Sequence, residues 1–128
     1  MITSMSIQLI CHATEDADKI KLAVEKRFDT KFFSERLLGH WNNPIFVLRA
    51  DLKKEKAESL LKKIKTKIKL KNFEERSESG EFFFRLSKKA LIREEVEEGN
   101  DIKFRIGVQT FPANAKKVSD FMRDFWKV

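Results

Sequence analysis

The segment DIKFRIGVQT, residues 101–110, decides the fold class because apolar and polar residues alternate along it. Alternation places successive side chains on opposite faces, as in a β-strand with one buried face. Residues 7–11 and 45–52 repeat the pattern over shorter stretches. Strict alternation, in place of a continuous apolar run, predicts a mainly antiparallel sheet that helices cover on one face and water wets on the other.

Other segments have the spacing of amphipathic helices. In residues 53–71 the apolar residues recur at i, i+3, i+4, i+7 and i+11, and the residues on this stripe are Ala57, Leu60, Leu61, Ile64 and Ile68. A similar stripe begins at residue 17, after acidic residues that favour a helix start. Asn114 is the expected cap of a C-terminal helix. These helices are expected to cover the sheet.

Shorter elements complete the predicted domain. They are a strand in the ambiguous residues 32–38, a hairpin of residues 73–76 and 81–86 around a turn at 77–80, and a short helix from 88 to about 96 capped by Ser87. The segment GHWNNP, residues 39–44, interrupts regular structure through its Gly, Asn and Pro content. The chain is therefore expected to form a single α+β domain over residues 1–128.

Composition limits the class of protein further. The chain has 128 residues, 41% of them hydrophobic, which suits one packed domain. Its single cysteine excludes an intramolecular disulfide and, with only two histidines, a structural zinc site of the Cys/His type. No segment approaches the ~20 apolar residues of a membrane helix, and no secretory leader is recognised. We therefore expect a cytoplasmic protein with no metal, no cofactor and no membrane contact.

The positive charge is concentrated in one segment. The formal net charge is +7, from 27 basic and 20 acidic residues. Residues 53–71 contain nine lysines and two acids, which leaves 18 basic and 18 acidic residues in the rest of the chain. The protein is therefore expected to present a single basic element on a neutral body.

This lysine segment is the first candidate site for a polyanion. On one helical face lie Lys62, Lys65 and Lys69, and the lysines that flank them are Lys54, Lys56, Lys63 and Lys67. Like charges at these spacings destabilise a helix, which favours a binding role such as holding RNA phosphates. Two alternatives stay open, namely a solvated surface of the kind found in heat-adapted proteins and a docking surface for an acidic protein partner.

The wet face of the predicted sheet is the second candidate site. Its expected side chains are Gln8, His12, Arg49, Lys103, Arg105 and Gln109. In the hairpin, Phe82 and Phe84 are expected to point into the core, so Phe83 and Arg85 share the open face. Rings that stack on bases and cations that hold phosphates are the groups with which single-stranded RNA binders work. The alternative is that Phe83 packs in a dimer interface or under a loop.

Several short blocks resemble an archaeal RNA-binding family that is described as a predicted exosome-associated subunit. The blocks are His12-Ala-Thr-Glu15, Gly39-His40 with Asn43-Pro44-Ile45, Arg85-Leu86 with Lys88 and Ala90, and Asp101-Ile102-Lys103. The resemblance implies an α+β fold like that of the ribosomal protein that binds the small ribosomal RNA of the large subunit. It also implies RNA binding without catalysis, with an exosome- or ribosome-related complex as the protein partner.

Three positions depart from the family pattern, namely Asn42, Ser87 and Lys89. None of them prevents the fold, because Asn tolerates a positive φ angle and Ser caps a helix. A diverged paralogue with another duty is the alternative. The complete set of candidate RNA-binding residues is Lys54, Lys62, Lys65, Lys69, Phe83, Arg85, Lys88, Lys103, Arg105 and His40.

Other classes of function have weaker support. His12 and His40 are the only histidines, and two imidazoles can act as the acid and base of a ribonuclease, but a turn histidine more often satisfies backbone groups. The acids of residues 94–101 lack the ligand spacing of a calcium loop. The competing non-enzymatic function is a homodimeric interaction module whose basic helix docks an acidic patch, such as residues 94–98, on its mate.

Overall fold

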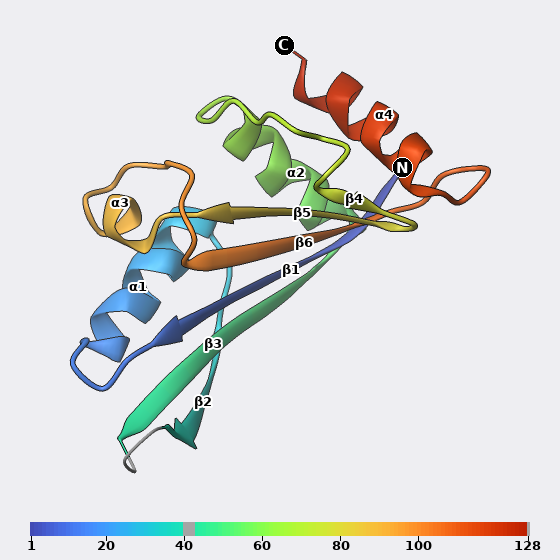
Figure 1. Cartoon of the computed structure of the whole chain (residues 1–128). Coiled ribbons are helices and arrows are strands. Elements are labelled where there is room, and N and C mark those ends of the chain that lie inside the picture. Colours follow the sequence, from blue (N-terminus) through green and yellow to red (C-terminus); the bar gives the residue numbers. More distant parts are fainter. Residues whose placement is uncertain (40–42, 128) are drawn as a thin grey trace.

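The chain folds around one antiparallel sheet (Figure 1), and the computed structural model describes residues 1–39 and 43–127. The six strands lie in the order β2-β3-β1-β6-β5-β4. The strands are β1 (Ile2–Cys11), β2 (Phe33–Leu38), β3 (Pro44–Lys53), β4 (Ser77–Glu78), β5 (Glu81–Leu86) and β6 (Ile102–Val108). The helices are α1 (Ala17–Phe28), α2 (Lys54–Lys65), α3 (Lys88–Ile92) and α4 (Ala115–Trp126). The predicted single α+β domain with a mainly antiparallel sheet is confirmed.

Alternation along the strands produces a single buried face, as predicted. β1 pairs with β3 on one side and with β6 on the other, so that Ile7 lies opposite both Ala50 and Phe104. These three side chains are buried in one core, which also contains the apolar stripes of α1, α2 and α4. Every second residue of β5, of β6 and of residues 5–11 of β1 enters this core, as do Leu48, Ala50 and Leu52 of β3, and the residues between them form the open face of the sheet. The edge strand β2 has no buried residue.

Local side-chain capping fixes the starts of three helices. Ser87 and Asn114 accept hydrogen bonds from Ala90 N at 3.3 Å and Lys117 N at 2.8 Å, so both predicted caps are confirmed. Asp16 caps α1 in the same way. Because Glu94 adopts a φ angle of 63°, which ordinary residues avoid within a helix, α3 ends at Ile92 and not near residue 96.

The lysine segment is only in part a helix. α2 ends at Lys65, and the Thr66 hydroxyl donates a hydrogen bond to the Lys63 carbonyl at 2.7 Å, an interaction that competes with further helix bonds. Ile68 is still buried, but from an irregular segment whose carbonyl accepts a hydrogen bond from Trp126 Nε1 at 3.0 Å. The predicted alignment of Lys69 with Lys62 and Lys65 on one helix is therefore wrong.

The predicted hairpin is displaced toward the C-terminus. Residues 73–76 are not a strand, because the Ser77 hydroxyl donates to the Phe73 carbonyl at 2.6 Å and holds this segment in a turn. The short strand β4 comes next, and the tight turn contains Gly80 at a φ angle of 83°. Phe73 nevertheless packs from its loop onto Phe82, with ring centroids 5.8 Å apart.

Candidate nucleic-acid interface

The open face of the sheet carries a row of polar side chains that crosses the strands. The pairing register places Gln8 of β1 between Arg49 of β3 and Lys103 of β6, and Lys103 lies opposite Arg85 of β5. Side chains that lie directly opposite one another on paired strands point to the same face. Four residues from four different strands thus meet on one surface, as the sequence predicted.

An aromatic ring lies at each side of this row. Phe83 is half-buried on β5 opposite Arg105, in the position predicted for it. Phe33 lies opposite Arg49 on the edge strand β2, and 78% of its surface is exposed. Sequence reasoning missed Phe33 because residues 32–38 were ambiguous. The signal available was the pair Phe32-Phe33, because adjacent side chains of an extended chain point to opposite faces, and Phe32 is the ring that enters the core.

Two grooves follow the open face. One has a volume of about 300 Å³, and Gln8, Phe83 and Lys103 are among its lining residues. The neighbouring groove has a volume of about 590 Å³ and extends to Arg49 and Gly80. Gln8 and Arg105 line both grooves, so the hollows adjoin one another in the middle of the sheet. The face therefore offers concave space beside its cations and not a flat surface.

The cations of the open face differ in how far protein groups neutralise them. Arg105 is paired with Glu81, with 2.9 Å between a guanidinium nitrogen and the carboxylate. Arg49 donates a hydrogen bond to the neutral Gln8 side chain at 3.3 Å. Within residues 1–39 and 43–127, no carboxylate lies at ion-pairing distance from Arg49, Arg85 or Lys103. These three cations are therefore the ones most available to phosphates.

Lys88, predicted to hold RNA phosphates from a position on or beside the sheet, is buried at the start of α3. Only 9% of the residue is exposed, and its ammonium group donates hydrogen bonds to the Ile10 carbonyl and to Glu15 Oε1, both at 2.9 Å. A buried charge needs such partners, and these two satisfy it inside the protein. Lys88 therefore joins α3 to the end of β1, and its geometry gives no support to an RNA contact.

This partly buried pair predicts a pH dependence of stability. Burial of Glu15 opposes its ionisation, but the His12 backbone N–H and the Lys88 ammonium outweigh burial and hold the pKa of Glu15 below its ordinary value. A carboxyl group with a lowered folded-state pKa stabilises the fold above its unfolded-state pKa, and this contribution disappears as the pH falls through the folded-state value. We expect Glu15→Gln to lower the free energy of unfolding by about 1 to 3 kcal/mol at pH 7, because it removes a charged hydrogen-bond partner.

Urea unfolding at several pH values measures this difference. The gap between the parent and Glu15→Gln should narrow as the pH falls below the ordinary Glu pKa of about 4.3. Glu75→Gln, at an exposed carboxylate, is the matched control and should leave stability nearly unchanged at every pH. A Glu15→Gln effect that is constant from pH 7 to pH 3 would show that the ion pair is not its cause.

The lysine segment lies on the opposite side of the molecule from the open face. α2 packs its apolar stripe on the core face of the sheet, so its exposed lysines point away from the sheet. Lys54 and Lys62 are exposed on α2, and Lys69 is exposed beyond its end. Lys65 is half-buried and donates a hydrogen bond to the Phe125 carbonyl at 3.1 Å. The two candidate sites are therefore separate surfaces and not one continuous patch.

The remaining sequence candidates contribute little to the open face. His40 lies outside the described residues, and with it one half of the two-histidine catalytic hypothesis. His12 is exposed beyond the end of β1. Cys11 points into the core as predicted, and burial raises the pKa of its thiol. In the described part of the chain, no group of three or more His, Cys, Asp or Glu side chains is placed to hold a metal ion.

None of the described helices has both the length and the apolar character needed to cross a membrane.

Comparison with known proteins gives one family and a consistent fold. A family model described as RNA binding matches residues 4–108, a range that includes Gln8, Arg49, Phe83, Arg85 and Lys103 of the open face. A DUF54 protein from Methanothermobacter thermautotrophicus is 26% identical, with a TM-score of 0.83 and 99% of both chains covered. A DUF54 protein from Sulfolobus solfataricus shares the fold at 20% identity, with a TM-score of 0.72 over 95% of this chain and 98% of that one. No curated protein matches the chain at a significant level.

Proposed function

The chain belongs to the family described as RNA binding, and from this premise we propose that it is a non-catalytic, cytoplasmic protein whose open sheet face binds single-stranded RNA. Its role would be that of an accessory in RNA processing, within an exosome- or ribosome-related complex. The family resemblance found in the sequence supports this finer assignment.

One observation carries the proposal, namely three cations that no carboxylate of the described residues pairs, together with two accessible rings, on the same face of the sheet. Arg49, Lys103 and Arg85 provide charge for phosphates, while Phe33 and Phe83 provide surfaces on which bases stack. Paired strands lie about 4.8 Å apart, so β2 and β5 are separated by roughly 19 Å. An RNA segment that reaches both rings must therefore run across the strands, over the adjoining grooves.

Single-stranded RNA, and not a duplex, suits this face. Exposed rings can stack only on bases that are unstacked from their neighbours, and a duplex keeps its bases paired. A ring on β5 also lies beside groups that recognise base edges, since Gln8 and Phe83 line the same groove. The predicted preference is for single strands over duplex RNA or DNA of equal length.

Replacing Phe83 by alanine tests the stacking role. We expect a loss of affinity of roughly 5- to 100-fold, because base stacking on an aromatic side chain contributes about 1 to 3 kcal/mol per base. The measurement is fluorescence anisotropy with a labelled single-stranded RNA at fixed salt. Phe83→Trp should retain binding, because indole stacks at least as well as phenyl.

Phe111 provides the matched control, since it is 98% exposed but lies beyond β6, outside the open face. Phe111→Ala should leave the affinity unchanged, while Phe33→Ala should weaken it. Circular dichroism establishes that each variant is folded. Equal affinities for the parent, Phe33→Ala and Phe83→Ala would contradict a stacking role for this face.

The alternative function is a homodimer in which the basic helix of one protomer docks on residues 94–98 of the other. The structure gives this alternative less support. Glu98 pairs with Arg76 at 2.9 Å, and Glu95 and Glu97 each lie 3.9 Å from Arg93. The acidic patch thus already has cationic neighbours within its own chain. This alternative stays a prediction, as does the absence of catalysis.

A further inference from the structure

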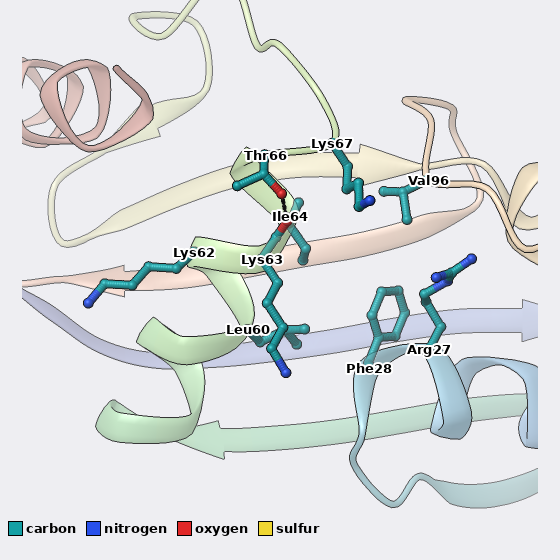
Figure 2. A pocket seen from close by; sticks show the side chains of 9 residues that line it. All are labelled: Arg27, Phe28, Leu60, Lys62, Lys63, Ile64, Thr66, Lys67 and Val96. Carbon is teal, nitrogen blue, oxygen red and sulfur yellow. Dashed lines mark hydrogen bonds between the residues drawn. The ribbon is translucent and has the colours of Figure 1, made fainter. Parts of the chain in front are cut away.

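The lysine segment borders a pocket on the helical side of the molecule, which is called the α2 pocket here. Its volume is about 380 Å³, and its floor consists of Phe28, Leu60, Ile64 and Val96. Figure 2 shows Phe28 and Val96 on one side, facing α2 with Leu60 and Ile64 on the other. Neither this pocket nor the lysines beside it take part in the RNA binding proposed for the open face.

Cations surround the apolar floor of the α2 pocket. The basic residues that line it are Arg27, Lys62, Lys63 and Lys67, and no acidic side chain is among its lining residues. Arg27 also donates a hydrogen bond to the Glu94 carbonyl, which ties α1 to the loop that carries Val96. The pocket wall formed by that loop is therefore held in place by a contact between segments 67 residues apart.

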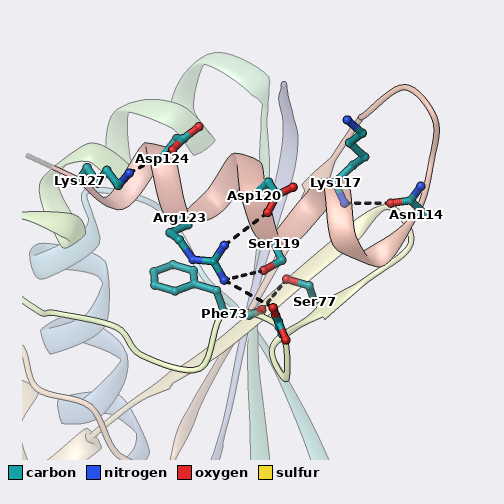
Figure 3. Close-up of polar contacts among 10 residues, drawn as sticks. Phe73, Ser77, Asn114, Lys117, Ser119, Asp120, Arg123, Asp124 and Lys127 are labelled. Carbon is teal, nitrogen blue, oxygen red and sulfur yellow. Dashed lines mark hydrogen bonds and ion pairs between the residues drawn. The ribbon is translucent and has the colours of Figure 1, made fainter.

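A second groove continues this surface around the end of α2. Its volume is about 480 Å³, it shares Thr66 and Lys67 with the α2 pocket, and Trp126 is among its apolar lining residues. Further cations on this groove are Lys65, Lys69 and Arg123. Arg123 is steadied by Ser119 and Asp120 and lies over the Phe73 ring (Figure 3). Two apolar hollows therefore lie on either side of one lysine-bearing ridge.

We propose that this surface docks an acidic segment of a partner protein, with bulky apolar side chains of that segment anchored in the α2 pocket and the adjoining groove. The charge is complementary at the α2 pocket, because Arg27, Lys62, Lys63 and Lys67 line it without an acidic side chain among the lining residues and attract carboxylates. Arg123 on the adjoining groove is already paired with Asp120 and Glu74 and adds little to this attraction. The floor supplies the affinity, because an apolar anchor gains from leaving water there. The inference is independent of RNA binding on the open face.

The chemistry of the floor favours a protein segment over RNA. Phosphates would satisfy the lysines, but a base placed in the α2 pocket would meet Leu60, Ile64 and Val96, which offer no polar group to its edges. Phe28 is only 4% exposed, so its ring face is not free for stacking. Aliphatic or aromatic protein side chains need neither hydrogen bonds nor a stacking plane in such a site.

Matched synthetic peptides test the proposal on the full chain. The probe is a labelled, Glu-rich peptide with two leucines four residues apart, compared by anisotropy with one in which both leucines are serines and with one in which Lys replaces Glu. The leucine peptide should bind about tenfold more tightly or better than the serine peptide, the factor expected for one buried leucine. The Lys peptide should not bind.

Two kinds of variant locate the binding. Lys63→Glu with Lys67→Glu reverses charge beside the pocket and should abolish binding of the leucine peptide, whereas Lys19→Glu with Lys116→Glu, at exposed lysines outside both hollows, should not. Val96→Trp fills the pocket without changing charge and should remove the preference for leucine over serine. RNA binding to the open face should survive all of these changes.

Three results would overturn the proposal. Equal binding of the leucine and serine peptides would show attraction by charge alone. Failure of every acidic peptide to bind at concentrations up to about 1 mM, which corresponds to about −4.1 kcal/mol, would show that there is no docking site. An RNA of equal charge that outcompetes the leucine peptide, and that loses affinity in Lys63→Glu with Lys67→Glu, would assign the surface to nucleic acid.

Discussion

Replacing Phe104 by alanine is expected to lower the free energy of unfolding by about 3 to 5 kcal/mol. Phe104 is 1% exposed. Its ring stacks on Phe84 with centroids 4.6 Å apart and meets the edge of Phe28 at 5.4 Å. Truncation therefore leaves a cavity at the point where β5, β6 and α1 meet. Urea unfolding measures the loss, which is a large fraction of the ~5 to 15 kcal/mol that stabilises a typical domain.

Phe111 again provides the control for this truncation. It is 98% exposed, so Phe111→Ala should change stability by less than about 0.5 kcal/mol. If Phe104→Ala lowers the free energy of unfolding by less than about 1 kcal/mol, the packing described is wrong. Removing a fully enclosed aromatic ring has so small an effect only where the core collapses into the cavity.

Removing three cations of the open face is expected to weaken RNA binding about 100-fold near 0.1 M salt. The variant is Arg49→Gln with Arg85→Gln and Lys103→Gln. On single strands, each lost phosphate contact lowers the slope of log affinity against log salt by about 0.7. The loss of three contacts therefore lowers the affinity by roughly two orders of magnitude at this salt concentration. The measurement is fluorescence anisotropy with the same labelled RNA.

The matched control removes three positive charges from the other side of the molecule. It is Lys54→Gln with Lys62→Gln and Lys69→Gln, all exposed lysines that the sequence marked as candidates. If the open face is the binding surface, the RNA affinity of this variant should fall by less than about fivefold. This small loss comes only from the lower net positive charge of the protein. Equal losses from the two triple variants would indicate binding by net charge without a defined site.

Much of the fold could be predicted because its signals are local. Alternation defines β1, β3 and β6, and the hydroxyl of Ser87 and the amide of Asn114 cap their helices as expected. Both signals depend on residues within a few positions of each other, so sequence spacing is sufficient to recognise them.

Two of the errors concern contacts between distant segments. The end of α2 depends in part on Trp126, whose indole N–H binds the Ile68 carbonyl from 58 residues away. The burial of Lys88 depends on partners 73 and 78 residues earlier in the chain. Neither partner can be inferred from local spacing, because a lysine stem and ammonium are compatible with both an exposed and a paired position.

The candidate site was predicted in composition but not in arrangement. Phe83, Arg85, Lys103 and Arg105 lie where alternation placed them, on the open face. The sequence also marked the lysine segment as a candidate site for RNA phosphates, but it did not show where this segment lies relative to the sheet. In the layered fold α2 covers the core face of the sheet and turns its exposed lysines to the opposite side. Total charge in the sequence could not reveal that separation.

The salt dependence of RNA binding tests most directly the claim that RNA lies on the open face of the sheet. The slope of log affinity against log salt is measured for the parent and for the two triple variants. We expect the open-face variant to lower the magnitude of the slope by about 2, and the lysine variant to leave it nearly unchanged. A slope that changes only in the lysine variant would place the RNA on α2 and contradict the account.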